Sequence, residues 1–243
     1  MSQAYVDTSR PAIKVSNLKK SFDDREILKG ISFEVYPGET LGIIGPSGCG
    51  KSTILKLLCG LIEPDGGEIV KESDELALVF QGSALLNSYT VRENLLLALK
   101  RRNLSAEEKE RQIRETLALV GLADYVEHYP NELSGGQQKR TSFARAVVFN
   151  PRIILYDEPT TGLDPVMSTI IEDYMIELEN KLHAASIVVT HQYSTWTRTA
   201  DRIIMMHAGR IVWQGTTQEA MRSENPYMHQ FAHATREGPM LNA

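Results

Sequence analysis

The sequence predicts an α/β fold in which a parallel sheet is interrupted by a helical insertion. Short apolar strands at residues 41–44, 153–156 and 187–189 run directly into glycine or polar residues. Helical patterns separate these strands, most extensively over residues 84–148. Strands joined by helices form parallel sheets whose reactive side chains lie at the carboxyl ends of the strands. We therefore expect the functional residues at that edge of the sheet.

The composition is typical of a globular protein. The 243 residues are 42% hydrophobic and 23% charged, which excludes collagen-like, coiled-coil and largely disordered chains. This length builds one large domain or two small ones without help from a disulfide or a metal. Cys49 and Cys59 are ten positions apart in one predicted loop and helix, which separates them by about 15 Å and prevents a disulfide. The cysteines therefore indicate a reducing compartment.

No membrane span or secretion signal is predicted. The longest apolar stretches, residues 57–62 and 95–99, are far shorter than the roughly 18 to 20 residues that cross a bilayer. Residues 1–10 are polar and lack the apolar centre of a signal peptide. The net charge of −5 argues against a general nucleic-acid binder, although one local basic pocket is compatible with it. We expect work at a membrane to require a partner, and no nucleic-acid partner.

The first predicted elements are strands and one helix. Residues 12–22 and 31–35 alternate between apolar and polar side chains as strands do, and a turn at 37–39 precedes the buried strand at 41–44. A helix is expected over residues 51–61, and the Pro-Asp-Gly-Gly turn that follows ends it.

Capping signals define the later helices. Ser105 and Glu108 form a capping box, and Gly121 ends that helix. Its apolar face consists of Ile113, Leu117 and Val120. Asp164 caps another helix that has Pro165 in its first turn and extends to about residue 182. A last hairpin follows, with strands at residues 203–206 and 210–214 joined by Ala208 and Gly209.

A phosphate-binding loop is predicted between the strand at 41–44 and the next helix. The pattern is glycine, four residues, then Gly-Lys-Ser. Backbone N–H groups of such a loop surround phosphates, Lys51 reaches the β- and γ-phosphates, and Ser52 ligates Mg²⁺. The candidate nucleotide-binding residues are Gly45, Pro46, Ser47, Gly48, Cys49, Gly50, Lys51, Ser52 and Thr53. The alternative is an ordinary glycine-rich turn between a strand and a helix.

Two acidic residues follow the strand at 153–156. Asp157 provides the second acid that a phosphate loop needs for its Mg²⁺ shell. Glu158 then stands beside the metal site, where a carboxylate polarises the attacking water and acts as general base. The alternative is an acidic helix start or a salt bridge in a loop.

The segment after Leu133 identifies a family. Ser134 and Gln137 make a capping box, but Gly135 and Gly136 are poor helix formers, which suggests that another group approaches this backbone closely. Leu-Ser-Gly-Gly-Gln resembles the signature of the ATP-binding-cassette (ABC) ATPases, and the resemblance extends from about residue 12 to the tail. In that family, the signature of one subunit binds the γ-phosphate held by the phosphate loop of a second copy, so a head-to-tail dimer is implied.

Four more residues match positions of that family. Phe22 matches the aromatic residue that stacks on adenine, and Gln81 matches the glutamine that touches Mg²⁺ and the water. Asp164 matches the loop that links the two sites, and His191 matches the switch histidine at the γ-phosphate. Each residue considered alone is compatible with an ordinary structural role, as a core, loop, capping or strand-end residue.

The resemblance implies a fold and a chemistry. The fold is a P-loop NTPase (RecA-like) core with an antiparallel β subdomain and an inserted α-helical subdomain. The implied activity is ATP hydrolysis with Mg²⁺, with Lys51, Gln81, Glu158 and His191 catalytic and with Ser52, Gln81 and Asp157 at the metal. The expected boundaries are an ATPase domain at 12–222, comprising a core at 12–83 and 149–222 with an insertion at 84–148, and a tail at 223–243.

Two stretches indicate a transporter subgroup. Only 83 positions separate Lys51 from Ser134, which excludes the long coiled-coil arm of chromosome-structuring and DNA-repair relatives. Residues 80–86 and the tail beyond Gly209 resemble ATPases of the Mla-type lipid transporters, which work with MCE-domain proteins. The resemblance implies a polytopic membrane permease as partner, an MCE-domain protein nearby, phospholipid or a related lipid as cargo, and a place at the cytoplasmic face of the inner membrane.

Alternatives to lipid transport stay open. They are an ABC importer or exporter of another substrate, and a scaffold-linked ABC ATPase of iron–sulfur cluster assembly. The connection between Ile69 and Phe80 has only ten residues, shorter than is usual in the family, which we interpret as a trimmed surface hairpin. In the tail, Thr216 and Glu219 cap one short helix and Pro226 starts another, whose apolar side packs either on its own domain or on the partner subunit.

Overall fold

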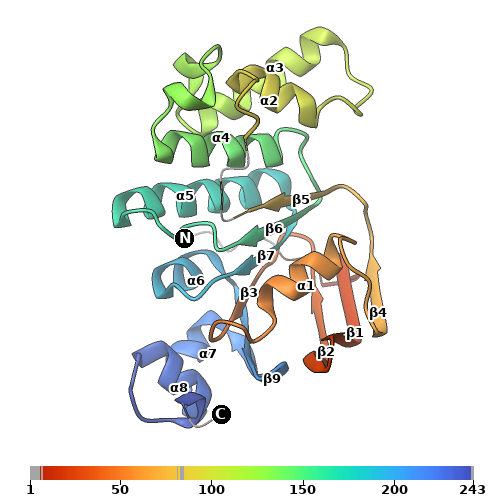
Figure 1. Cartoon of the computed structure of the whole chain (residues 1–243), viewed down its shortest axis with the longest axis vertical. Helices are drawn as coiled ribbons and strands as arrows, with labels where there is room; N and C mark the ends of the chain where they lie inside the picture. Colours follow the sequence, from red (N-terminus) through yellow and green to blue (C-terminus); the bar gives the residue numbers. More distant parts are fainter. Residues whose placement is uncertain (1–5, 7, 81, 83–84, 242–243) are drawn as a thin grey trace.

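Two sheets organise the molecule in the computed structural model, which describes residues 6, 8–80, 82 and 85–241 (Figure 1). The smaller sheet is antiparallel, with strand order β2-β1-β4. The larger has the order β5-β6-β7-β3-β8-β9, and its pairs are parallel except for β8 with β9. The strands are β1 (Ile13–Phe22), β2 (Arg25–Val35), β3 (Thr40–Ile44), β4 (Gly66–Lys71), β5 (Leu76–Val79), β6 (Ile153–Asp157), β7 (Ala185–Val189), β8 (Arg202–His207) and β9 (Arg210–Thr216).

Helices cover both faces of the larger sheet and form a separate layer at one end (Figure 1). The α-helices are α1 (Lys51–Leu58), α2 (Val91–Ala98), α3 (Ala106–Leu119), α4 (Gly135–Val147), α5 (Pro165–Leu182), α6 (Tyr193–Thr199), α7 (Thr217–Met221) and α8 (Pro226–His233). Short 3₁₀ turns lie at Ala123–Tyr125, Pro130–Glu132 and Pro239–Leu241. Figure 1 shows α2, α3 and α4 beyond α5 at one end of the molecule, with α1 and the small sheet on the other side of the large sheet.

Alternation along the strands builds two cores. Ile154 and Tyr156 in β6 pack with the helical layer, α5 and α6, whereas Ile153 and Leu155 pack with α1 and the small sheet. All four side chains are at most 1% exposed. Successive side chains of a strand point to opposite faces, so a strand buried on both faces reads as a continuous apolar run. The predicted α/β fold, with a largely parallel sheet, a smaller antiparallel sheet and an inserted group of helices, is confirmed.

The predicted caps are confirmed. Ser105, Ser134 and Thr216 each make the expected capping box, with Glu108, Gln137 and Glu219 respectively. Asp164 accepts hydrogen bonds from the backbone N–H groups of the first turn of α5. These signals act over three residues, so the local sequence determines them.

The structure corrects two predicted boundaries and adds two strands. β2 begins at Arg25, six residues before the predicted start at 31, because it pairs with β1 along nearly its whole length. α1 ends at Leu58 rather than at 61, because Gly60 adopts a left-handed φ of 68°. Two strands, β4 and β5, had no predicted counterpart, and β4 starts within the turn expected to end at 67.

The tail packs on its own chain in this structure. Met228 of α8 is fully buried, and α8 contacts α7 and β9. Asn225 caps α8 by accepting from the N–H groups of Tyr227 and Met228. In the ranges that the structure describes, no helix combines the length and the apolar character needed to span a bilayer. Cys49 and Cys59 are free, as expected.

Candidate functional site

The loop between β3 and α1 has a backbone that only glycine can adopt at two positions. Gly45 has a φ of 144°, and a Cβ there would lie 2.2 Å from the Met206 carbonyl oxygen. Gly50 has a φ of 107°, and its Cβ would lie 2.6 Å from Leu28 Cδ2. Lys51 is 7% exposed, and its Nζ donates to the carbonyl oxygens of Gly45 (2.8 Å) and Pro46 (3.0 Å). Two backbone carbonyl groups of the loop therefore hold the lysine ammonium.

An open cleft lies directly outside this loop. Its volume is about 310 Å³, and Phe22, Arg25, Gly48 and the start of α1 line it. Phe22 ends β1 and is 46% exposed, and the Lys20 ammonium lies 5.5 Å from the centroid of its ring. A flat aromatic face at one end and a phosphate loop at the other fit the two ends of a nucleotide.

Two side chains with oxygen atoms, Ser52 and Asp157, meet at the start of α1 and the end of β6. Ser52 Oγ donates to Asp157 Oδ1 at 3.0 Å. Burial raises the pKa of Asp157, and the Ser52 hydrogen bond partly opposes this shift. A hydroxyl and a carboxylate are the hard oxygen ligands that Mg²⁺ prefers, so this donor set fits the expected metal. Gln81, the third expected ligand, lies outside the described residues.

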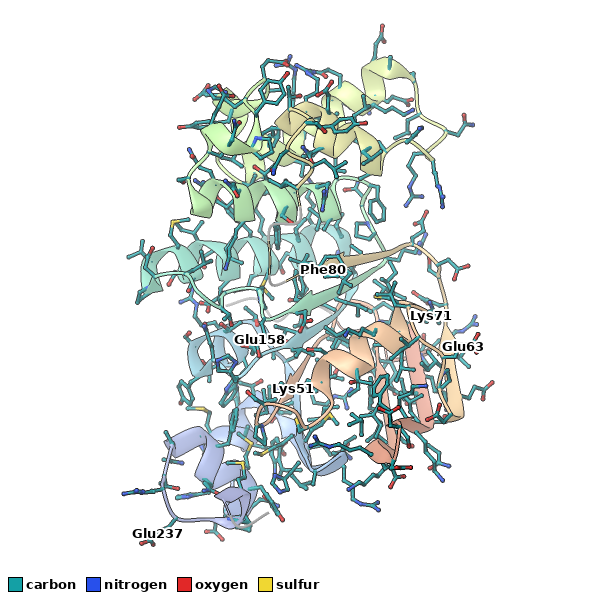
Figure 2. All side chains as sticks on the ribbon, viewed as in Figure 1. Lys51, Glu63, Lys71, Phe80, Glu158 and Glu237 are labelled. Carbon is teal, nitrogen blue, oxygen red and sulfur yellow. The ribbon has the colours of Figure 1, made fainter. Side chains whose placement is uncertain are left out.

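Glu158 is held by several donors at the carboxyl ends of β6 and β7. His191 Nδ1 lies 2.8 Å from Glu158 Oε1. The hydroxyls of Thr161 and Thr190 donate to Oε2 at 3.1 and 3.3 Å, and the His191 backbone N–H lies 3.4 Å from the same oxygen. Figure 2 shows Glu158 and Lys51 in the same part of the molecule, beside the strand ends. The predicted acid and histidine are therefore in direct contact.

Sequence reasoning missed the two threonines that hold this carboxylate. Thr190 directly follows the predicted strand at 187–189, and Thr161 lies in the loop before Asp164. Both lie within three residues of a predicted catalytic group, and hydroxyls at such distances often orient a carboxylate. Their proximity in sequence was the available signal.

The signature segment lies apart from the phosphate loop. It begins α4 in the helical layer, whereas α1 lies on the other side of the large sheet (Figure 1). A Cβ on Gly135 would meet nothing within 4 Å, and one on Gly136 would lie 3.2 Å from Met167 Cε in α5. The first glycine therefore leaves its backbone open to a group from outside this chain. Asp164, which caps α5, lies on the loop just before that helix.

Comparisons with known proteins identify the family. The family model described as ABC transporter matches residues 28–161. Protein TRIGALACTOSYLDIACYLGLYCEROL 3, chloroplastic, of Arabidopsis thaliana is 42% identical over 94% of this chain and 75% of its own length. The probable sulfate/thiosulfate import ATP-binding protein CysA of Chlorella vulgaris is 34% identical over 86% of this chain and 92% of its own length.

A solved structure agrees with the sequence relatives. It is cbiO1 from Clostridium perfringens, described as part of the ABC transporter complex cbiONQ, with a TM-score of 0.81 and 26% identity. The match covers 88% of this chain and 92% of that chain. The glycine-rich loop between β3 and α1, the Ser52–Asp157 pair and the Glu158–His191 contact occur here on the same fold. The chain belongs to the ABC transporter family as an ATP-binding subunit, an ATPase that uses ATP with Mg²⁺.

Proposed function

We propose that this chain is the ATP-hydrolysing motor of a transporter that moves phospholipid or a related lipid. The observation that carries the catalytic part is the 2.8 Å contact between His191 Nδ1 and Glu158 Oε1 at the strand ends that also bear the phosphate loop. A carboxylate oriented in this way accepts a proton from water, and an imidazole beside it reaches the γ-phosphate.

Each residue then has one task. Phe22 stacks on the adenine, residues 45–53 surround the phosphates, and Lys51 moves from its loop carbonyls to the β- and γ-phosphates. Ser52 and Asp157 hold Mg²⁺, which when bound neutralises charge on the phosphate oxygens. Gln81 is assigned to the same shell by its sequence position. Glu158 Oε1 or Oε2 receives the water proton, and the surrounding hydroxyls keep the carboxylate aimed.

Hydrolysis is proposed to need two copies of the chain. Ser134 and the open backbone of Gly135 bind the γ-phosphate held by the partner, and Gln137 supports this turn through the capping box. Asp164 then lies at the contact between the two sites. The division into a core at 12–83 and 149–222, an insertion at 84–148 and a tail at 223–243 serves this arrangement, because the insertion carries the signature and the core carries the phosphate loop.

The proposed cargo rests on the similarity to lipid-transport ATPases. The Arabidopsis relative is named for trigalactosyldiacylglycerol, a glycerolipid, and residues 80–86 and the tail resemble the Mla-type group. We place the chain at the cytoplasmic face of the inner membrane, bound to a polytopic permease, with an MCE-domain lipid-binding protein in the same assembly. The 34% identity to a sulfate/thiosulfate import protein favours a second candidate, an importer motor for another substrate.

One purification separates these candidates. The chain is tagged, expressed in its native cell and purified from solubilised membranes, and the bound proteins and lipids are identified by mass spectrometry. A permease with an MCE-domain protein and co-purified phospholipid supports the lipid proposal. A permease with a solute-binding protein supports the importer, and iron–sulfur assembly proteins would refute transport altogether.

A further inference from the structure

Behind the catalytic contact lies a chain of polar side chains that the mechanism above does not use. Thr160 and Thr195 are fully buried, and Glu172 is 1% exposed. Thr160 Oγ1 lies 2.7 Å from Gln192 Oε1 and 2.7 Å from Thr195 Oγ1. Thr195 Oγ1 lies 2.9 Å from Glu172 Oε1. These four residues, which we call the buried relay, connect the loop after β7 to α6 and α5.

Counting protons gives the buried relay a direction. Glu172 Oε2 pairs with Arg198 Nε at 2.7 Å, so this carboxylate end only accepts. The relay has three contacts, and its two hydroxyls supply two protons. The oxygen and nitrogen of the Gln192 side-chain amide have nearly the same shape, so the amide can be turned by about 180° at the same position. Its NH₂ then faces Thr160 Oγ1 in place of Oε1 and supplies the third proton. Every hydrogen bond then runs from Gln192 to Glu172, and bonds aligned in this way strengthen one another.

The buried relay begins beside both partners of the catalytic contact. Thr160 is two residues after Glu158, and Gln192 directly follows His191. The Gln192 backbone N–H also donates to Thr190 Oγ1 at 3.0 Å, and that hydroxyl in turn lies 3.3 Å from Glu158 Oε2. The loop that carries His191 is therefore held by two sets of hydrogen bonds, one to the Glu158 carboxylate and one to the buried relay.

We propose that the buried relay positions His191 against Glu158, so that Thr160, Thr195 and Glu172 are positioning residues for ATP hydrolysis. The proposal rests on the proposed function, since it requires that this contact serves catalysis. Glu172 lies within α5, the helix that Asp164 caps, so the relay also ties the histidine to the helix that follows the inter-site loop. A displacement of a catalytic group by about 1 Å can reduce turnover about 100-fold, so a support of this kind has a large effect on rate.

The test removes hydroxyls without changing shape. Thr195→Val and Thr160→Val each break the buried relay, whereas Thr→Ser at either position retains the hydroxyl. Thr199→Val is the matched control, because Thr199 is buried on the same helix and its hydroxyl donates only to the backbone oxygen of Thr195 at 2.8 Å. Steady-state ATPase rates give kcat and KM, nucleotide titration gives ATP affinity, and thermal melting gives Tm.

We expect the two valine variants to lower kcat by about tenfold or more with KM for ATP within about twofold of wild type, since only the arrangement of catalytic groups changes. The serine variants recover kcat, and the double valine variant loses little more than either single one because the relay acts as a unit. Equal kcat losses in Thr195→Val and Thr199→Val, or failure of serine to recover kcat, overturn the proposal.

Two measurements keep this test separate from the proposed function. Wild-type turnover and its loss in Glu158→Gln test the function, whereas the valine comparison is read only against an active wild type. If Thr195→Val does not fold, Thr160→Val provides the same comparison. A normal kcat in any folded variant that breaks the relay contradicts the positioning role.

Discussion

A buried pair of carboxyl groups makes folding sensitive to pH. Glu179 near the end of α5 is 9% exposed, and its Oε2 accepts from Thr40 Oγ1 at 3.0 Å. Asp201, just before β8, accepts from the Thr40 backbone N–H at 2.9 Å. Burial, reinforced by the charge of Asp201, raises the pKa of Glu179 from 4.5 to about 8. Burial also raises the pKa of Asp201. The folded pair therefore keeps a proton at neutral pH.

The direction of the pH effect on stability follows from the protonation of Glu179 in the folded and the unfolded chain. Between pH 4.5 and about 8, the folded chain holds a proton on Glu179 that the unfolded chain has lost. The free energy of unfolding therefore falls as pH rises through this window, and the stabilisation is complete only below the unfolded pKa. Each pH unit is worth up to about 1.4 kcal/mol, and the change from pH 6 to pH 8 amounts to about 2 kcal/mol after allowing for partial titration at the upper end.

Glu179→Gln removes this titrating proton and should weaken the pH dependence of the free energy of unfolding. Urea unfolding at pH 6, 7 and 8 gives the free energy for wild type and variant, and we expect wild type to lose about 2 kcal/mol more than the variant across this range. Glu177→Gln is the control, because Glu177 is exposed on the same helix and its variant should follow the wild-type slope. Parallel curves for Glu179→Gln and wild type would refute the shared-proton argument.

The remaining predictions concern the nucleotide and the tail. Glu158→Gln should bind ATP but stop phosphate release, because an amide accepts no proton from water, and near wild-type turnover would remove its role as base. Lys51→Ala should weaken ATP binding in a nucleotide titration and abolish turnover. On the Glu158→Gln background, Ser134→Arg should leave ATP binding intact and prevent the ATP-dependent dimer, as measured by light scattering in Mg-ATP. Deletion of residues 224–243 should lower Tm because it exposes the surface under Met228; an unchanged Tm with lost dimer would instead support a cross-subunit tail.

Local signals explain what the sequence could predict. The phosphate loop, the capping boxes and the start of α5 depend on residues within a few positions of one another, so the pattern and the structure agree there. β4 was missed because it is defined by antiparallel pairing with β1, some fifty residues earlier, and much of its surface is exposed. Its sequence, Gly-Gly-Glu-Ile-Val-Lys, has turn residues where the strand begins. A short, half-exposed strand has too few buried positions to show an alternating hydrophobic pattern, so its pairing with a distant strand cannot be predicted from the local sequence.

The same limit applies to the site. The positions of Asp157 and Glu158 at a strand end could be predicted because acidic residues follow a buried apolar strand, whereas the expectation for His191 depends on the family resemblance. Thr160 and Thr195 are 35 positions apart, and nothing in either local sequence indicates that their hydroxyls meet in the interior. Threonine is common at helix starts and strand ends, so only the packing of the loop after β6 against α6 reveals the contact. Supporting residues of this kind are defined by tertiary structure rather than by a motif.

The contacts around Glu158 support an unusual backbone geometry at this residue. Its φ of 49° lies in the left-handed region, which costs a non-glycine residue roughly 1 to 2 kcal/mol. Asparagine and aspartate, which occupy this region at Asn17 and Asp23, tolerate it better than glutamate does. The turn is held by the Glu158 N–H, which donates to the Val189 oxygen at 2.9 Å, and by the side-chain contacts with His191 and Thr190. Because these contacts connect the end of β6 to the end of β7, the position of the Glu158 carboxylate depends on the packing of both strand ends.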